Sequence, residues 1–100
     1  MNDTSYEINI NPYPNQEFSV VIENNEYFFN ITTRENNTLY LDLELNGVLI
    51  FQGIRLDANT DLLENYHHLG IQGQLVLLNN DDGIPSFERL GIEDKLYYVP

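Results

Sequence analysis

The sequence lacks cysteine and has very few basic side chains. Without cysteine, disulfide bonds and thiolate metal sites are excluded by composition. Only 4 lysines and arginines stand against 16 aspartates and glutamates, so the formal net charge is −12. So few cations cannot build the positive surface of a typical nucleic-acid-binding protein, and they disfavour adsorption to an anionic membrane. The charge instead favours a basic or divalent-metal partner, or a neighbour of opposite charge in an assembly.

Long hydrophobic runs are also missing. The longest unbroken apolar stretch is about four residues, as in Val48 to Phe51, which is far too short for a transmembrane helix. The polar start, Met1 to Thr4, does not resemble a signal peptide. What the sequence does contain is 42% hydrophobic residues, with 7 tyrosines and 5 phenylalanines, and this composition excludes bulk disorder. A chain of 100 residues is expected to form one domain, residues 1–100, with one core.

Alternation of apolar and polar residues is the main secondary-structure signal. It is clearest in residues 38–46, where leucines at positions 39, 41, 43 and 45 share one face of a strand. Similar patterns predict strands at residues 6–10, 18–22, 27–34, 48–52, 74–78 and 95–99. The strand at 74–78 is apolar on both faces, which favours a central position in a sheet.

Asparagine-rich turns separate the strands of the first half. Asn24-Asn25 fits a two-residue type I′ turn, Asn36-Asn37 marks a second turn of the same kind, and Asn46-Gly47 is the strongest short hairpin signal in the chain. These turns predict four consecutive strands in an antiparallel meander.

The middle of the chain has a different pattern. Residues 57–61 are rich in helix-capping types, the apolar residues up to Leu69 follow helical spacing, and Gly70 is a natural stop, so we expect a short α-helix here. Residues 87–91 are expected to form one helical or 3₁₀ turn. The predicted fold is therefore all-β with one short α-helix, a meander closing into a small barrel, with a two-sheet sandwich as the alternative.

None of the candidate reactive groups forms a motif. His67 and His68 are adjacent, so on a helix they point about 100° apart and do not converge on one metal. The turn at residues 79–83 resembles a calcium loop but lacks the acids that an EF-hand requires. Asp42 and Glu44 could pair for acid–base chemistry, but the wet face of an amphipathic strand explains them more simply. We therefore predict no catalytic residue, no metal site and no cofactor, and a protein that is not an enzyme.

An ordered set of short segments in the second half resembles a known family. The segments are Gly53-Ile54-Arg55-Leu56, Asp61-Leu62-Leu63, residues 66–71, Gly73-Gln74-Leu75, Pro85-Ser86-Phe87, Leu90-Gly91 and residues 96–99. Their order and spacing are similar to those of the phage baseplate plug family, small proteins of contractile-tailed bacteriophages. The first half, with a Tyr-Glu-Ile-x-Ile strand followed by a proline-containing turn and a hairpin series, agrees with that pattern.

The resemblance implies a structural role. It implies a protein of the virion tail baseplate, assembled in the host cytoplasm, that contacts other baseplate or tail hub proteins. No nucleic acid, membrane or small-molecule partner is expected. If exposed strand edges pair with neighbours, the segment from Lys95 to Pro100 is one candidate, with Leu96, Tyr97, Tyr98 and Val99 as its interface residues.

The alternative is a small acidic binding or inhibitor module, for example a DNA mimic that occupies the basic site of a host protein. Such mimics need carboxylates arrayed along one face, whereas the acids here scatter mostly through predicted turns, as at Glu35, Asp57 and Asp81.

Overall fold

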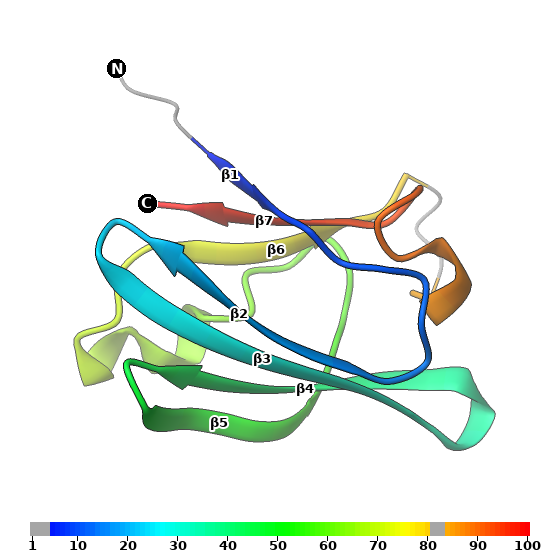
Figure 1. Ribbon diagram of the computed structural model, residues 1–100, viewed down its shortest axis with the longest axis horizontal. Coiled ribbons are helices and arrows are strands. Elements are labelled where there is room, and N and C mark those ends of the chain that lie inside the picture. The colour runs from blue at the N-terminus through cyan, green and yellow to red at the C-terminus, as the bar shows by residue number, and fades with distance from the viewer. Residues whose placement is uncertain (1–4, 81–83) are drawn as a thin grey trace.

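The computed structural model describes residues 5–80 and 84–100 and contains two antiparallel sheets (Figure 1). The first sheet has the strand order β1-β7-β6, and the second has the order β2-β3-β4-β5. The strands of the first sheet are β1 (Tyr6–Ile8), β6 (Gln74–Leu78) and β7 (Lys95–Val99). Those of the second are β2 (Gln16–Ile22), β3 (Asn25–Arg34), β4 (Thr38–Leu45) and β5 (Val48–Arg55). The meander predicted for the first half is therefore confirmed as the second sheet.

The hairpin turns follow the expected chemistry, with two corrections. Asn46 and Gly47 have φ values of 52° and 83°, as a type I′ turn requires. The first turn lies one residue earlier than predicted, because Glu23 and Asn24 take the positive φ values and Ile22 pairs with Asn25. The second connection is a three-residue 3₁₀ turn, η1 (Glu35–Asn37), rather than a two-residue turn.

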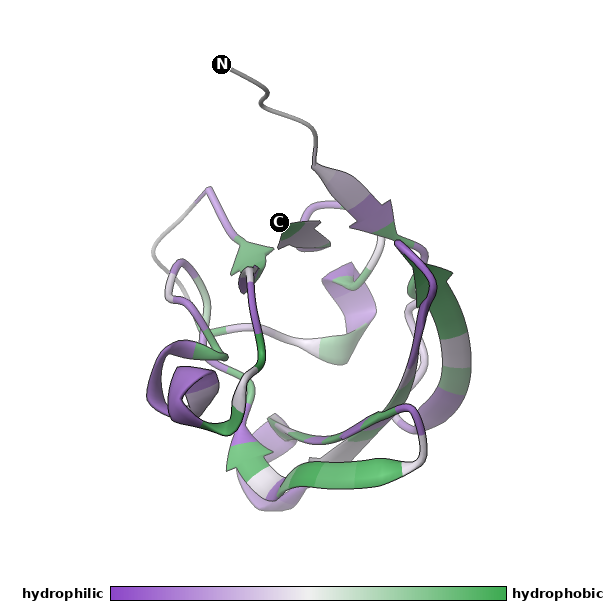
Figure 2. Cartoon of the chain, turned by 90° about the vertical axis from the view of Figure 1, so that its left-hand side faces the viewer, coloured by the Kyte–Doolittle hydropathy of each residue, from purple (hydrophilic) through white to green (hydrophobic). Residues whose placement is uncertain are grey.

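The core lies between the two sheets. The leucines at 39, 41 and 43 of β4 are at most 2% exposed, and Leu45 packs at the core margin, so the leucine face points inward as predicted. Leu75 and Leu77 of β6 and Leu96 of β7 supply the opposite side. In the end-on view of Figure 2, strands and connections surround the volume that these side chains fill.

The barrel prediction is not confirmed. Among residues 5–80 and 84–100, strand pairing forms two separate sheets, and neither β2 nor β5 pairs with a strand of the first sheet. The two-sheet sandwich, our alternative, is consistent with this arrangement. The sheets are bridged by side chains, as where the ring centroids of Tyr27 and Tyr98 lie 5.5 Å apart.

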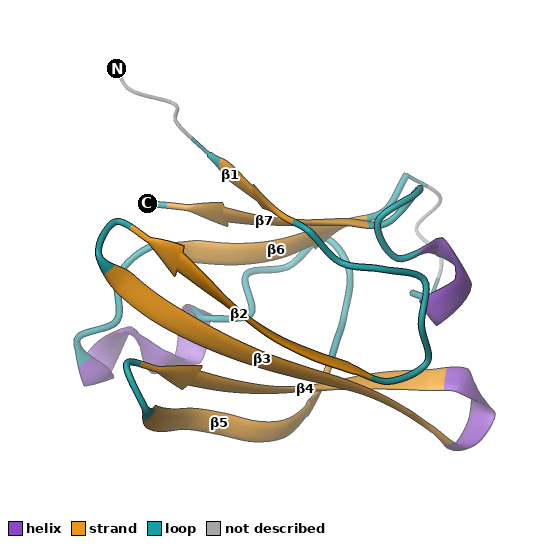
Figure 3. Ribbon diagram, in the orientation of Figure 1, coloured by secondary structure: helices purple, strands orange, loops and turns teal. Residues whose placement is uncertain are grey.

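The α-helix prediction is wrong, because the helical turns in the described part of the chain are 3₁₀. Figure 3 shows where these turns lie, in purple. The 3₁₀ helix η2 (Glu64–Leu69) occupies the second half of the region where we expected the α-helix. It ends before Gly70, as predicted, and Gly70 has a φ of 84°. The preceding residues form an isolated bridge, a bend and a turn instead of a helix, because their backbone groups hydrogen-bond to β6. The Asn59 backbone amide donates to the Leu77 carbonyl at 2.8 Å, and the Leu62 backbone amide donates to the Leu75 carbonyl at 2.8 Å. The 3₁₀ turn expected near residue 87 is present as η3 (Phe87–Arg89).

Strand β6 was predicted to be central, yet it is the last strand of its sheet. Its outer edge is nevertheless occupied in part, because the segment containing Asn59 and Leu62 donates to it as described above. This segment, rather than a further strand, covers part of that edge, while the second apolar face of β6 carries Val76 and Leu78 and is not buried.

Candidate protein interface

Strand β7, which contains the predicted interface residues, has a neighbour on each edge. Tyr98 is in register with Tyr6 of β1 on one side and with Leu75 of β6 on the other. The idea that this strand offers a free edge to a partner is therefore wrong for the folded chain, since its backbone groups already serve two ladders.

The side chains of β7 divide between the two faces of the sheet. Leu96 and Tyr98 are 1% and 5% exposed and belong to the core. The Tyr98 hydroxyl donates to the Gln72 carbonyl at 3.0 Å, and its ring fills the space that a Cβ at Gly73 would need. Only Tyr97 and Val99 remain on the outside, where both are partly exposed.

These two side chains share the outer face of the sheet with apolar residues of β6. Val76, Leu78, Tyr97 and Val99 line a shallow hollow of about 350 Å³ together with Ser5. Leu78 is 48% exposed although it is a large apolar side chain. Apart from Gln74 and Lys95, the outward positions of both strands are thus apolar where an ordinary solvent-facing sheet would be polar.

A second hollow of about 380 Å³ continues this surface past Leu78 and Tyr97 toward Ile92 and Lys95. Ile92 is 61% exposed. We call the surface formed by Val76, Leu78, Ile92, Tyr97 and Val99 the outer face. It is rimmed by Lys95 and, through the β1–β7 register, by Glu7 beside Tyr97.

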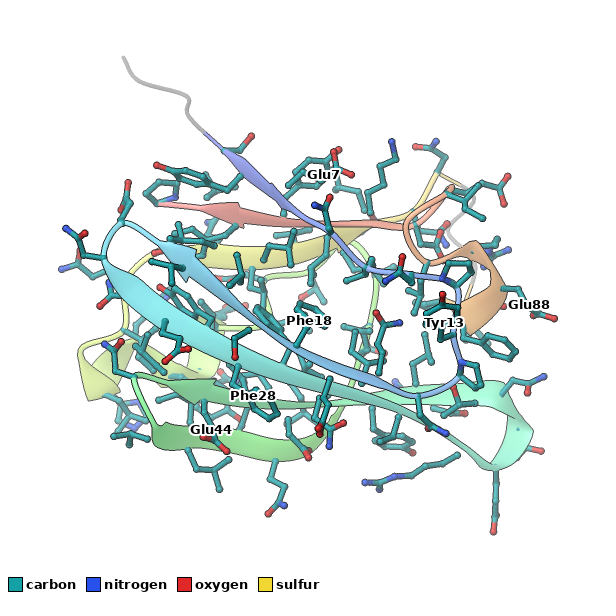
Figure 4. The ribbon with its side chains drawn as sticks, in the orientation of Figure 1. Glu7, Tyr13, Phe18, Phe28, Glu44 and Glu88 are labelled. Carbon is teal, nitrogen blue, oxygen red and sulfur yellow. The ribbon has the colours of Figure 1, made fainter. Side chains whose placement is uncertain are left out.

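The paired carboxylates of β4 have structural surroundings. Asp42 accepts a hydrogen bond from the Gly53 amide at 2.6 Å and one from the Asn30 side chain at 3.3 Å. It therefore ties β4 to the irregular part of β5, where the register shifts and Gly53 has a φ of 70°. Glu44 stands in register with Phe28 on the outside of the second sheet (Figure 4). Both observations agree with the simpler interpretation of these acids.

Of the two histidines, His67 lies in a structural position, and His68 is exposed on the same turn. His67 Nε2 is 2.9 Å from the Gly73 carbonyl oxygen and 3.8 Å from Asp61 Oδ2, so its ring connects η2 to the start of β6. Among the residues with described positions, no three potential ligands lie close enough to hold a metal ion. The calcium-like turn lies partly outside the described residues, which exclude 81–83.

Sequence reasoning missed a buried ionic cluster beneath the outer face. Asp94 is 1% exposed and accepts a hydrogen bond from the Asn79 side-chain Nδ2 at 2.9 Å. Its second oxygen lies 3.5 Å from Arg89 Nε, and Arg89 Nη2 donates to the Ile84 carbonyl at 2.7 Å. No spacing rule could have found it, because nothing in a Glu-Asp-Lys sequence says which carboxylate is buried. The cluster fixes the connection that carries Ile92.

Two tyrosine hydroxyls near the first sheet have perturbed acidity. Burial, reinforced by the neighbouring Tyr98 hydroxyl, raises the pKa of Tyr27 well above its usual value of 10. Burial and the Glu23 carboxylate, which accepts a hydrogen bond from Tyr6 at 3.3 Å, raise the pKa of Tyr6. These hydroxyls are therefore neutral over the physiological pH range.

Comparison with known proteins agrees with this arrangement. A family model described as cyanophage baseplate Pam3 plug gp18 matches residues 5–100. No curated protein matches the chain. In the described part of the chain no helix is both long and apolar enough to cross a membrane. The match extends over both sheets and confirms the resemblance to phage baseplate plugs, whose place is the virion tail. The chain therefore belongs to the cyanophage baseplate Pam3 plug gp18 family, and it is a baseplate plug protein.

Proposed function

We propose that this protein is a non-enzymatic structural component of the tail baseplate that docks onto another baseplate or hub protein through its outer face. It would assemble there in the host cytoplasm as a single domain of residues 1–100. The observation that carries the proposal is the group of exposed apolar side chains on the outer face, where Leu78 of β6 is 48% exposed and Ile92, in the connection before β7, is 61% exposed. Family membership indicates a location in the tail baseplate, and the outer face is the surface through which we expect the protein to bind its neighbour.

The physical case rests on burial of the apolar side chains. Removing apolar surface from water yields roughly 25 cal/mol per Å², and an aromatic such as Tyr97 adds contact area with little loss of side-chain entropy. The buried Asp94 cluster and the two-sided pairing of β7 hold this surface rigid before binding. A preformed surface loses less conformational entropy when it docks.

Charge sets the expected nature of the neighbour. With a net charge of −12, the protein would be attracted to a more basic surface, and the association should weaken as salt increases. Association that is unchanged between low and high salt would assign the charge to solubility alone.

The test is virion incorporation of charged variants. Leu78→Asp and Tyr97→Asp, introduced into the viral genome, should reduce the copy number of the protein in purified virions at least tenfold. Val48→Asp is the matched control, because Val48 is also a large exposed apolar residue, at 63%, and gains the same charge on the far strand β5. Circular dichroism of each purified variant checks folding.

Unchanged incorporation of folded Leu78→Asp and Tyr97→Asp proteins would overturn the outer-face contact. Absence of the wild-type protein from virions, with recovery of a host nuclease or polymerase in a stable complex, would instead support the inhibitor alternative.

A further inference from the structure

A groove of about 480 Å³ opens between strand β1, the connection that follows it, and strand β2. It adjoins the outer face at Glu7, which stands beside Tyr97 and also lines the groove. Its walls come from Glu7 and Ile8 of β1, the connection through Tyr13, and β2 from Gln16 to Val20. In Figure 4, the labelled side chains of Glu7, Tyr13 and Phe18 lie around this opening. Phe18 stacks on Phe29, with ring centroids 5.1 Å apart, so this part of the groove is held by the core.

The β2 side of the groove is an unpaired strand edge. Ile22 and Asn25 close a two-residue type I′ turn, and such a closing pair exchanges both of its backbone hydrogen bonds. Counting back along β2, every second residue from Ile22 is bonded to β3, while Glu17, Ser19 and Val21 direct their N–H and C=O groups away from the sheet. Within residues 5–80 and 84–100, no strand pairs with this edge.

Strand β2 is also the longest regular free edge that the described residues offer, since the edge strand β1 has only three residues. It pairs with β3 over seven consecutive residues without a register shift. By contrast, β5 at the opposite end of the sheet shifts register twice against β4, and such irregularities discourage pairing at an edge. The outer edge of β6 is occupied in part by the segment that contains Asn59 and Leu62.

The wall opposite this edge is preorganised. The Asn11 amide donates to the Gln16 side chain at 3.1 Å, and the Gln16 side chain donates back to the Asn11 carbonyl at 2.6 Å. The Asn15 side chain accepts a hydrogen bond from the Thr33 amide at 3.2 Å. The connection between β1 and β2 therefore has a fixed shape, and an incoming chain would not have to order it.

The charge of the groove defines its occupant. The lining residues include Glu7 and Glu17, both exposed, and no lysine or arginine. An extended segment that pairs with β2 presents alternate side chains toward the groove wall, so basic residues at every second position would face these carboxylates.

We propose that β2 accepts an extended, basic segment of a neighbouring protein as an added antiparallel or parallel strand, held by the outward backbone groups of Glu17, Ser19 and Val21. The proposal rests on the proposed function in one respect: the protein that contributes the added strand is a neighbour in the baseplate. Pairing by main-chain hydrogen bonds gives affinity, while the acidic lining selects the charge of the partner.

The test uses the full ¹⁵N-labelled chain and a blocked peptide with lysine at every second position, Ac-Thr-Lys-Val-Lys-Val-Lys-Thr-NH₂, titrated by NMR at low salt. Chemical-shift changes and slowed amide exchange should centre on Glu17, Ser19 and Val21. The same peptide with glutamate in place of lysine should bind at least about tenfold more weakly.

Ser19→Pro supplies the decisive variant, because it removes one outward N–H without removing a hydrogen bond to β3. Its affinity for the lysine peptide should fall at least about tenfold, while Ser19→Ala, which keeps the N–H, should bind like wild type. Leu49→Pro is the matched control on the free edge of β5, and it should leave binding unchanged. Thermal melting confirms that each variant is folded.

Shift changes centred on the outer face, equal binding of both peptides, or no binding at millimolar peptide would overturn the proposal. None of these outcomes bears on virion incorporation through Leu78 and Tyr97, so failure of this inference and failure of the proposed function are distinguishable.

Discussion

Gly91 should be the position at which a single added methyl group is most damaging. It has a φ of 79°, and a Cβ there would overlap the carbonyl oxygen of Ile10, which is a backbone atom with no rotamer to change. Gly70 is the matched control, since its φ is 84° and a Cβ there meets nothing within 4 Å. Both alanine substitutions carry the left-handed backbone cost of about 1–2 kcal/mol.

The extra cost at Gly91 comes from displacing Ile10. Ile10 is 6% exposed, and withdrawing a buried isoleucine side chain costs about 1.5–3 kcal/mol. Gly91→Ala should therefore lose about 3–5 kcal/mol of unfolding free energy in urea titrations followed by circular dichroism, against about 1–2 kcal/mol for Gly70→Ala. Because Ile10 lies between Asn9 and Asn11 in the connection that walls the β2 groove, a folded Gly91→Ala protein should also bind the lysine peptide less well. Equal stability losses for the two variants would refute the packing argument.

The Asp94→Ala variant should lose about 3 kcal/mol of unfolding free energy, because the substitution leaves the mostly buried charge of Arg89 unpaired. The Asp57→Ala variant should lose less than about 1 kcal/mol, because its ion pair with Arg55 is exposed. Urea titrations of both variants make the comparison. Similar losses would show that burial of the first pair is energetically unimportant. Because the pKa of Tyr27 is raised in the folded protein, its hydroxyl loses its proton at lower pH in the unfolded state than in the folded state. The contribution of Tyr27 to the free energy of unfolding should therefore be fully present below pH 10 and should fall above pH 10 by about 1.4 kcal/mol per pH unit. Tyr27→Phe should flatten that fall, and an identical alkaline slope in the variant would contradict this origin.

Hydrophobic alternation was enough to predict the meander but not the first turn. Placing the turn at Asn24-Asn25 or at Glu23-Asn24 shifts the pairing by two residues, which leaves the same side chains facing the core. The choice depends on Asn46, whose side chain donates to Asn25 at 3.0 Å and accepts from the Glu26 amide at 2.9 Å. A contact between residues twenty positions apart cannot be found from local pattern.

The candidate interface was also predictable only in part, because the pattern along one strand does not show which strands pair with it. Alternation along 95–99 implies two faces, but it does not say that β1 and β6 occupy both edges of β7. Leu96 and Tyr98 therefore proved to be core residues, while Tyr97 and Val99 remain available. The free edge of β2 was hidden because Phe18 and Val20 indicate only which face is buried, not which edge is paired.

The position of β7 between β1 and β6 has a consequence for the order of folding. The four strands of the second sheet are consecutive in the chain, so each can pair with its neighbour as soon as both exist. The first sheet has no such local route, since β1 and β6 do not pair directly and both depend on β7. Tyr6 must find Tyr98 across 98 − 6 = 92 positions of chain. We therefore expect the meander to form early and to present an uncovered apolar face until β7 arrives, and this half-folded state is where the chain is most exposed to premature association with its neighbours.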